Sequence, residues 1–221
     1  IGGSVGRVEA TGRGVTIIAY QCMEKNNIDP AHAAIAVQGM GNVGGTAAEI
    51  FYNNGQKVVA VSDYTGGLYC EDGLDIPAIR KFISGKNTLD KYEADNVKHI
   101  SNDELITCKC DVLIPAALEN QITEDNAGRI QAKLIIEAAN GPTSVEADEI
   151  LNSRGIIVCP DILSNAGGVV VSYFEWVQNI QNLTWDLEEV NKMLQKIMLT
   201  AFNEVYALSQ EKNVTLRMAA Y

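Results

Sequence analysis

The chain has 221 residues, of which 47% are hydrophobic, enough to form a core for one large or two small domains. Its formal net charge of −11 argues against nucleic acid as a partner, since binding a phosphate backbone requires clustered lysine and arginine. We find no charged-then-apolar leader and no apolar run long enough to span a membrane, so we expect no membrane partner.

The five cysteines have irregular spacing along the chain. Cys108-Lys109-Cys110 has neither the C-x-x-C spacing nor the nearby histidines of common metal sites. We interpret all five as reduced thiols and predict no metal site. A soluble protein of a reducing compartment follows, and we expect it to be cytoplasmic.

The first predicted element is an amphipathic helix over 4–24, where apolar residues recur at helical spacing. Gly12 and Gly14 lie inside it, where each costs about 1 kcal/mol relative to alanine. A close backbone approach is therefore expected there, and packing of the helix on a sheet is the simplest reason.

Strands and helices then alternate. Short apolar runs predict strands at about 33–38, 57–62, 112–114, 134–136 and 156–158. Helices are expected at about 75–84, 123–131, 144–153, 166–180 and 187–212. Near-continuous apolar strands separated by helices predict an α/β fold: a doubly wound, mostly parallel Rossmann sheet with helices on both faces and two long C-terminal helices. With no repeat or linker, residues 1–221 are expected to form one dinucleotide-binding domain.

A glycine-rich turn, Gly39-Met40-Gly41-Asn42-Val43-Gly44, follows the first strand and precedes a helix-like stretch. In this context G-x-G-x-x-G brings backbone N–H groups and a helix N-terminus to a pyrophosphate. Asp63 ends the next strand about twenty residues later, where an acid would meet the adenosine ribose. The pattern predicts a dinucleotide site. Methyltransferases have similar turns for S-adenosylmethionine, which is the alternative ligand.

Two asparagines lie where α/β sheets bind ligands. Asn140 follows the strand at 134–136, although an Asn-Gly-Pro sequence is also typical of a simple turn. Asn165 precedes Gly167 and Gly168 at a helix start, where free N–H groups could meet a polar ligand or belong to an ordinary capped helix.

Four segments together carry a resemblance to a known family. They are Arg7-x-x-Ala10-Thr11-Gly12-Arg13-Gly14-Val15, the glycine-rich turn, Glu137-Ala138-Ala139-Asn140-Gly141-Pro142, and Asn165-Ala166-Gly167-Gly168-Val169-x-x-Ser172-Tyr173-x-Glu175-Trp176. The chain resembles the cofactor-binding domain of glutamate dehydrogenases, within the Glu/Leu/Phe/Val dehydrogenases, over essentially its whole length.

The resemblance implies reversible oxidative deamination of L-glutamate to 2-oxoglutarate and ammonia, with hydride passing to a nicotinamide. It implies cofactor contacts at Thr11, Gly39, Gly41, Asn42, Val43, Gly44, Asp63, Ala116, Asn140 and Asn165. Among these, Asp63 would bind the adenosine ribose, and Asn140 and Asn165 the nicotinamide ribose and carboxamide. Ser172 would donate to the distal carboxylate of glutamate and Val169 would line the same pocket, although a helical serine can instead bond to its own turn.

The family's catalytic lysine and aspartate belong to a substrate domain that precedes the segment matched by this chain. Nothing here matches them, so we assign no catalytic residue and expect the chain to bind cofactor without turnover. The resemblance also implies a homo-hexamer for the full-length protein.

NAD is the expected cofactor, because Asp63 would repel a 2′-phosphate and residues 64–67 include no basic side chain. NADP remains an alternative, since the family does not follow the acidic-residue rule uniformly. Two other functions stay open: the cofactor domain of a leucine or phenylalanine dehydrogenase, and a non-catalytic nucleotide-sensing Rossmann module. A sensor of adenine nucleotides would not need Thr11, Asn140 and Asn165, whose implied roles lie at the nicotinamide end of the cofactor.

Overall fold

The computed structural model describes residues 2–221 and is built around one seven-stranded sheet of order β4-β3-β2-β1-β5-β6-β7. The strands are β1 (Ala34–Gln38), β2 (Lys57–Asp63), β3 (Gly66–Tyr69), β4 (Lys98–Ile100), β5 (Val112–Pro115), β6 (Leu134–Ile136) and β7 (Ile157–Cys159).

Ten α-helices and one short 3-10 helix, η1 (Leu89–Lys91), are formed by the described residues. The α-helices are α1 (Ala10–Lys25), α2 (Asn42–Asn53), α3 (Ile76–Ser84), α4 (Asn102–Ile106), α5 (Glu124–Ala127), α6 (Val145–Ser153), α7 (Asp161–Ser164), α8 (Gly167–Gln181), α9 (Leu187–Lys212) and α10 (Leu216–Ala220). By length and hydropathy, none of the helices within residues 2–221 qualifies to cross a membrane.

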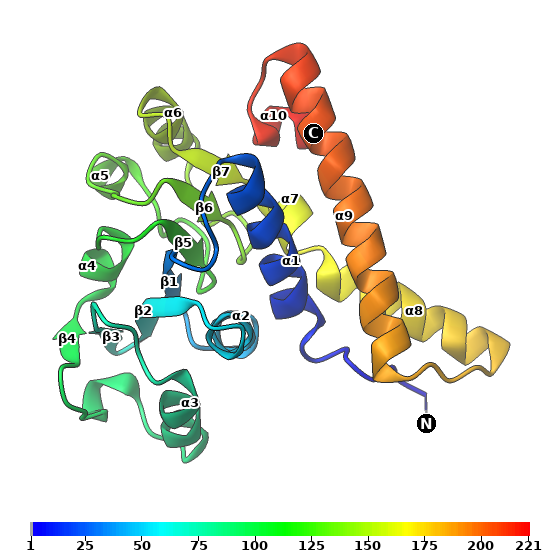
Figure 1. Cartoon of the computed structure of the whole chain (residues 1–221), viewed down its shortest axis with the longest axis horizontal. Helices are drawn as coiled ribbons and strands as arrows, with labels where there is room; N and C mark the ends of the chain where they lie inside the picture. The colour runs from blue at the N-terminus through cyan, green and yellow to red at the C-terminus, as the bar shows by residue number, and fades with distance from the viewer. Residues whose placement is uncertain (1) are drawn as a thin grey trace.

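The sheet separates two hydrophobic cores, one on each face. On one face Ala36 and Leu113 pack with α4, α5 and α6; on the other, Val37 and Ile114 pack with the remaining α-helices, α1 and α9 among them. Figure 1 shows the first group of helices on the left of the sheet and α1, α2, α8 and α9 on the right. Because successive side chains of a strand point to opposite faces of the sheet, an unbroken apolar run contributes side chains to both cores.

The expected fold class is confirmed: β2, β1, β5, β6 and β7 are parallel. Gln38 lies in register with both Ser62 and Pro115, so the carboxyl ends of the three central strands reach the same edge. The two antiparallel pairings at one end of the sheet, β2 with β3 and β3 with β4, were not predicted. Both β3 and β4 are short, and β3 has two glycines and β4 two exposed polar residues, so neither forms an apolar run.

The first helix was predicted over 4–24, but α1 begins only at Ala10. Gly6 has a φ of +77°, which a right-handed helix does not permit. Val5 and Val8, which suggested the longer helix, are exposed. The segment before Ala10 is therefore a turn whose apolar residues match helical spacing by coincidence.

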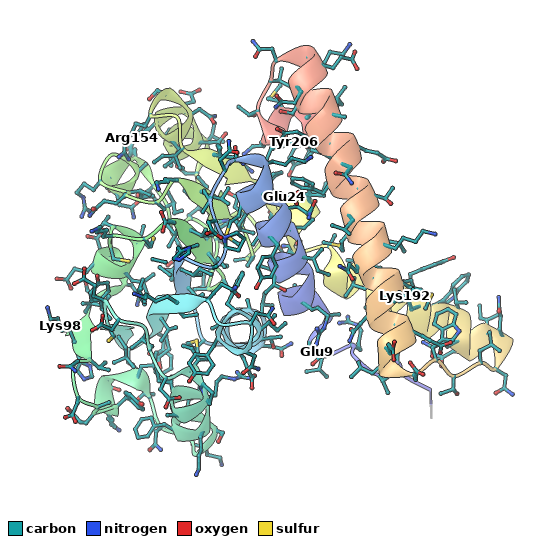
Figure 2. The ribbon with its side chains drawn as sticks, in the orientation of Figure 1. Glu9, Glu24, Lys98, Arg154, Lys192 and Tyr206 are labelled. Atoms are coloured by element: carbon teal, nitrogen blue, oxygen red, sulfur yellow. The ribbon has the colours of Figure 1, made fainter. Side chains whose placement is uncertain are left out.

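The helix predicted over 123–131 is also shorter, since α5 ends at Ala127. The carbonyls of Ala127, the last residue of α5, and of Ile130 accept hydrogen bonds from the guanidinium of Arg154, 2.7 Å long in the case of Ile130. Figure 2 labels Arg154 near α5 and α6. The side chain of Arg154, which follows α6, thus satisfies the Ala127 carbonyl, which in a helix continued to residue 131 would have accepted an N–H of that helix. The other predicted helices and strands are present, with ends displaced by at most two residues.

Candidate functional site

A cleft of about 660 Å³ lies at the carboxyl ends of β5 and β6, beside the first turns of α1, α2 and α8. Its lining is made by Arg7, Thr11, Val43, Ala116, Ala117, Leu118, Glu119, Ala138, Ala139, Asn140, Asn165, Gly168, Val169 and Ser172. The structure thus brings together seven of the twelve residues assigned from the sequence, although they come from five separate segments of the chain.

The glycine-rich turn connects β1 to α2, and its glycines serve different purposes. Gly39 has a φ of +94°, and a Cβ there would lie 2.9 Å from the carbonyl oxygen of Ala116. A Cβ on Gly44 would overlap the carbonyl oxygen of Gly39, so the helix packs directly on the turn. A Cβ on Gly41 would meet no atom within 4 Å. Gly41 is therefore a glycine that the protein's own packing does not require.

Gly41 is also the N-cap of α2, with an ordinary φ of −70° and no side chain capping the helix. The first N–H groups of a helix have no partner within the helix, and they carry the positive end of its dipole. The open space at Gly41 thus lies beside donors that favour an anion.

Asn42 lies outside the cleft lining, and its amide nitrogen already donates to the carbonyl of Val8 at 2.7 Å. This bond joins the start of α2 to the segment before α1. Among the described residues, this bond uses one of the two N–H groups of the amide, so the second N–H and the side-chain oxygen of Asn42 stay available to a ligand.

Asp63 ends β2 on the same edge of the sheet as the glycine-rich turn, where Gly39 N donates to Ser62 O at 3.0 Å. One carboxylate oxygen of Asp63 accepts the N–H of Thr65 at 2.7 Å and its hydroxyl at 2.5 Å, and the other accepts the N–H of Leu89 at 2.9 Å. The side chain thus organises the β2–β3 turn and η1, a role that the sequence did not indicate.

Asn140 and Asn165 meet in the cleft. Asn165 Nδ2 donates to Asn140 Oδ1 at 2.8 Å, although the two residues are 25 positions apart. Each amide has two N–H groups and one oxygen, so Asn140 keeps its N–H₂ group and Asn165 its oxygen for another partner. The pair presents a donor and an acceptor side by side.

Ser172 donates its hydroxyl to the carbonyl of Gly168 at 2.9 Å, which is the local bond considered as the alternative to substrate binding. Its oxygen can still accept a hydrogen bond, but donation to a substrate carboxylate would need the hydroxyl to rotate. Val169, one turn earlier, is 74% exposed at the mouth of the cleft.

Close contacts between helices explain the glycines of α1. A Cβ on Gly12 would lie 2.7 Å from Thr46 Cβ and from the carbonyl oxygen of Val43 in α2. A Cβ on Gly14 would lie 3.0 Å from Gly167 Cα in α8. The close approach was expected against the sheet, and the structure corrects this: α1 packs against two other helices, which places Thr11 in the cleft.

Glu137, at the end of β6, is fully buried and was given no role from the sequence. Its carboxylate accepts two hydrogen bonds from Arg217 of α10, at 2.7 and 3.1 Å, and the N–H of Asp161 at 3.0 Å. Burial opposes the charge on Arg217, but the hydrogen bonds and charges of Glu137 and Asp148 outweigh it and raise the pKa of Arg217. The ion pair anchors the strand that leads to Asn140.

The cleft has polar and apolar walls but few ionisable groups. Among residues 2–221, its lining contains Arg7 and Glu119 but no lysine, aspartate, histidine or cysteine. Arg7 lies 4.0 Å from Glu175 of α8, and the sequence gave it no role. Within the same described range, no group of three or more histidine, cysteine or acidic side chains is arranged to hold a metal ion.

Comparison with known proteins agrees with this geometry. The family model described as Glutamate/Leucine/Phenylalanine/Valine dehydrogenase matches residues 2–221. A glutamate dehydrogenase of Thermotoga maritima is 50% identical over all of this chain, and an NADP-specific glutamate dehydrogenase of a Synechocystis strain is 49% identical, also over all of it. The chain covers 53% of each of these two relatives, so it spans about half their length.

A solved structure shows the same architecture. The hetero-hexameric glutamate dehydrogenase of Thermus thermophilus, in a leucine-bound form, superposes with a TM-score of 0.93 at 31% identity, over 99% of this chain and 51% of that one. The match of a family model to nearly every residue is decisive. This chain belongs to the glutamate/leucine/phenylalanine/valine dehydrogenase family.

Proposed function

We propose that residues 1–221 are the nicotinamide-dinucleotide-binding domain of a glutamate dehydrogenase. The observation that carries the proposal is Gly41, where a glycine with an ordinary φ and open space around it stands at the unpartnered N-terminus of α2. Neither backbone conformation nor internal packing requires glycine there. Close approach of a pyrophosphate does.

The remaining assigned residues fit the two ends of a dinucleotide. Gly39, Gly44 and Val43 form the turn and helix start beneath the pyrophosphate, and Asp63 lies one strand away for the adenosine ribose. Ala116 and Thr11 line the cleft. Asn140 and Asn165 offer a donor and an acceptor, which matches the complementary groups of a carboxamide and a ribose.

The nicotinamide would supply the hydride acceptor for oxidation of L-glutamate to 2-oxoglutarate and ammonia, and the donor for the reverse reaction. The role of this chain is to bind and orient the nicotinamide cofactor. Val169 and Ser172 extend the cleft from Asn165 along α8, and we assign them to the substrate's side chain.

Turnover belongs to the full-length protein, which we propose to be a homo-hexamer. Within residues 2–221 the cleft offers no lysine or aspartate, so the general acid–base groups would come from the half of the relatives' length that this chain does not cover. All five cysteines are free thiols, which fits a reducing compartment such as the cytoplasm.

NAD is the cofactor we favour. Asp63 places a carboxylate at the end of β2, and a 2′-phosphate would have to approach it. Its two hydrogen-bonded oxygens hold that carboxylate in place, so it cannot swing away from a phosphate without breaking the turn. The NADP-specific Synechocystis relative keeps NADP as the competing choice.

Isothermal titration calorimetry with NADH, NADPH and S-adenosylmethionine tests the proposal. Gly41→Val should abolish NADH binding and leave the fold intact, since its side chain enters open space at an ordinary φ. Gly128→Val is the matched control: it too has open space and ends a helix with a φ of −64°, but lies away from the cleft.

We expect NADH to bind more tightly than NADPH to the unmodified chain and to Gly128→Val. Tight binding of S-adenosylmethionine without NADH would overturn the proposal in favour of a methyltransferase. Binding of an adenine nucleotide with equal affinity whether or not it carries a nicotinamide would favour the sensing module. Retention of NADH affinity in Gly41→Val would remove the observation on which the proposal rests.

A further inference from the structure

Cys108 and Cys110, here called the thiol pair, lie between α4 and β5. Only Lys109 separates them, in a bend that follows α4 and leads to Val112, the first residue of β5. Both cysteine side chains pack on the same hydrophobic core, the one covered by α4, α5 and α6. The Cα atoms of residues two positions apart lie within about 7 Å of each other. Two cysteines at this spacing that face the same core can bring their sulfur atoms together.

Hydrogen bonding between the two thiols makes them chemically unequal. It lowers the pKa of Cys108, and partial burial opposes this shift without cancelling it. The same hydrogen bond, with burial, raises the pKa of Cys110 well above that of an ordinary cysteine. Cys110 thus donates to Cys108 and keeps its own proton. Because the thiolate rather than the thiol is the nucleophile, Cys108 is the reactive member of the pair.

Access to solvent also distinguishes Cys108 from the other cysteines. Of the five, all within the described residues, Cys108 is partly exposed and the other four are buried. Cys110 borders a pocket of about 450 Å³ at the amino ends of β1, β2 and β5, together with Tyr69 and Asp111. A small oxidant can therefore reach the Cys108 sulfur from solvent, and the pocket leaves room for the Cys110 side chain to reorient.

A second pair of neighbouring thiols lacks this access. Cys22 of α1 is a hydrogen-bond partner of Cys159 at the end of β7, and both side chains are fully buried. Burial and this hydrogen bond raise the pKa of Cys159. Cys22 and Cys159 thus share the proximity of the thiol pair but not its contact with solvent. They form an internal control within the same chain.

We propose that Cys108 and Cys110 are an oxidation site, at which a hydroperoxide converts the two thiols into a disulfide. The inference is independent of the proposed function, since it uses none of the residues that line the cleft. Cysteines that respond to oxidants are accessible, have a low pKa and lie next to a second cysteine that can form a disulfide with them. Cys108 meets all three conditions.

The reaction consumes one hydroperoxide in two steps. The Cys108 thiolate attacks the terminal oxygen of the hydroperoxide and the O–O bond breaks. The leaving alkoxide takes a proton from solvent, and Cys108 becomes a sulfenic acid. The Cys110 sulfur then attacks the Cys108 sulfur, the S–O bond breaks, and hydroxide leaves with the Cys110 proton as water. The two thiols lose two electrons, and the hydroperoxide gains them.

The thiol pair is remote from the candidate site. Cys110 lies before the amino end of β5, whereas Ala116 of the cleft follows its carboxyl end. Figure 1 shows α4 on the left of the sheet, on the face opposite α1 and α8. We therefore expect the disulfide to form without a change in NADH affinity.

Mass spectrometry detects the disulfide directly. The reduced chain is freed of reductant, treated with hydrogen peroxide, blocked with N-ethylmaleimide and digested with trypsin. Trypsin cleaves after Lys109, between the two cysteines. The disulfide should join peptides 99–109 and 110–129 with the loss of two hydrogens, and dithiothreitol should separate them. Without peroxide, both peptides should carry maleimide.

The buried cysteines control for unfolding in the same digest. Cys108 and Cys110 should become unreactive toward maleimide roughly tenfold faster than Cys22 and Cys159, because only the former pair is open to solvent. Cys70→Ser removes a buried thiol outside both pairs, so it should leave the disulfide yield unchanged.

Single variants assign the role of each sulfur. In Cys110→Ser the sulfenic acid on Cys108 has no partner, so dimedone, a reagent that traps sulfenic acids, should label Cys108. In Cys108→Ser dimedone should leave Cys110 unlabelled, because Cys110 is buried. Melting temperatures of both variants close to that of the unmodified chain would show that the substitutions leave the fold intact.

Three results would overturn the proposal. Oxidation of Cys22 and Cys159 as fast as Cys108 and Cys110 would show that the chain opens and that the thiol pair is not selective. Stable dimedone labelling of Cys108 in the unmodified chain, with peptides 99–109 and 110–129 never joined, would show that Cys110 does not react with it. Joined peptides found only in a covalent dimer would assign the disulfide to a contact between two chains.

Discussion

Asn165 holds Asn140 by a 2.8 Å hydrogen bond that joins the end of α7 to the loop after β6. The bond consumes one donor and one acceptor and leaves a fixed donor and a fixed acceptor facing the cleft. The orientation of each amide is thereby set by the other.

Asn140→Asp should separate the structural role of Asn140, as acceptor of the Asn165 N–H, from its role as a donor to the cofactor. The aspartate still accepts the N–H of Asn165, so the loop keeps its position, but the free N–H₂ donor is lost. We expect NADH affinity to fall about tenfold, the worth of one hydrogen bond, with little change in melting temperature. Asn203→Asp, at an exposed position on α9, makes the same chemical change elsewhere and should leave calorimetric affinity unaltered.

Asp63→Ser should have two effects. The ratio of NADPH to NADH affinity should rise roughly tenfold because a repelling carboxylate is removed. The free energy of unfolding should also fall by about 1–2 kcal/mol, because the N–H of Leu89 loses its acceptor. Asp72→Ser removes an equal charge from an exposed loop and controls for net charge. A shift in cofactor preference of the same size in both variants would contradict the assignment of Asp63.

Arg217→Met should destabilise the chain by about 3–5 kcal/mol, since it leaves the fully buried Glu137 without its cation. Adding Glu137→Leu should recover much of this loss. Lys212→Met, which removes an exposed partner of Glu211, should cost less than about 1 kcal/mol. Urea unfolding of five proteins gives the comparison: the unmodified chain, Arg217→Met, Glu137→Leu, the double variant and Lys212→Met. An additive loss in the double variant would argue against a coupled pair.

Gly14→Ala tests the close packing of α1 on α8. In an open helix the change would stabilise by about 1 kcal/mol. Here the new Cβ would lie 3.0 Å from the backbone of Gly167, which cannot move without shifting the cleft, so we expect destabilisation of about 1–3 kcal/mol. A rise in the free energy of unfolding would indicate an open helix position, and a fall would indicate close packing of α1 on α8.

The ion pair between Asp103 of α4 and Arg129, which follows α5, should weaken at acid pH. The hydrogen bond from Arg129 lowers the pKa of Asp103, so the folded state favours the charged carboxylate. Its stabilisation is present above the ordinary aspartate pKa near 4 and is lost as pH falls through the lowered value. Both side chains are about half exposed, so the effect should stay below about 1 kcal/mol. Arg129→Gln should return the Asp103 pKa, measured by NMR titration, toward its ordinary range.

Much of the molecule followed from the sequence alone. The apolar runs at 112–114 and 134–136 predicted buried parallel strands because a strand covered on both faces needs no polar side. The glycine-rich turn and Asp63 predicted a dinucleotide site because glycine and acid spacing reflect a local βαβ geometry. Each of these patterns is local, extending over at most a few tens of residues of the sequence.

Other features were predicted wrongly or missed, because they do not follow from a local pattern of the sequence. The helix start at Ala10 depends on the φ of Gly6, and β3 and β4 have too little apolar character to be recognised without their neighbours. Apolar spacing at Val5 and Val8 indicated a helix, although these side chains face solvent. Periodicity identifies a face but cannot say what lies against it.

The sequence by itself determined the fold class, the family motifs and the residue types offered to a cofactor, because these depend on local patterns of burial and backbone conformation. Only the tertiary structure decided that Asn165 orients Asn140, that Asp63 secures η1, and that Arg217 neutralises the buried Glu137. It also showed that α8 presents a second apolar face to solvent. The three contacts join groups 25 to 80 residues apart, and the apolar face of α8 is a matter of exposure. Neither is fixed until chain segments distant in sequence have packed together.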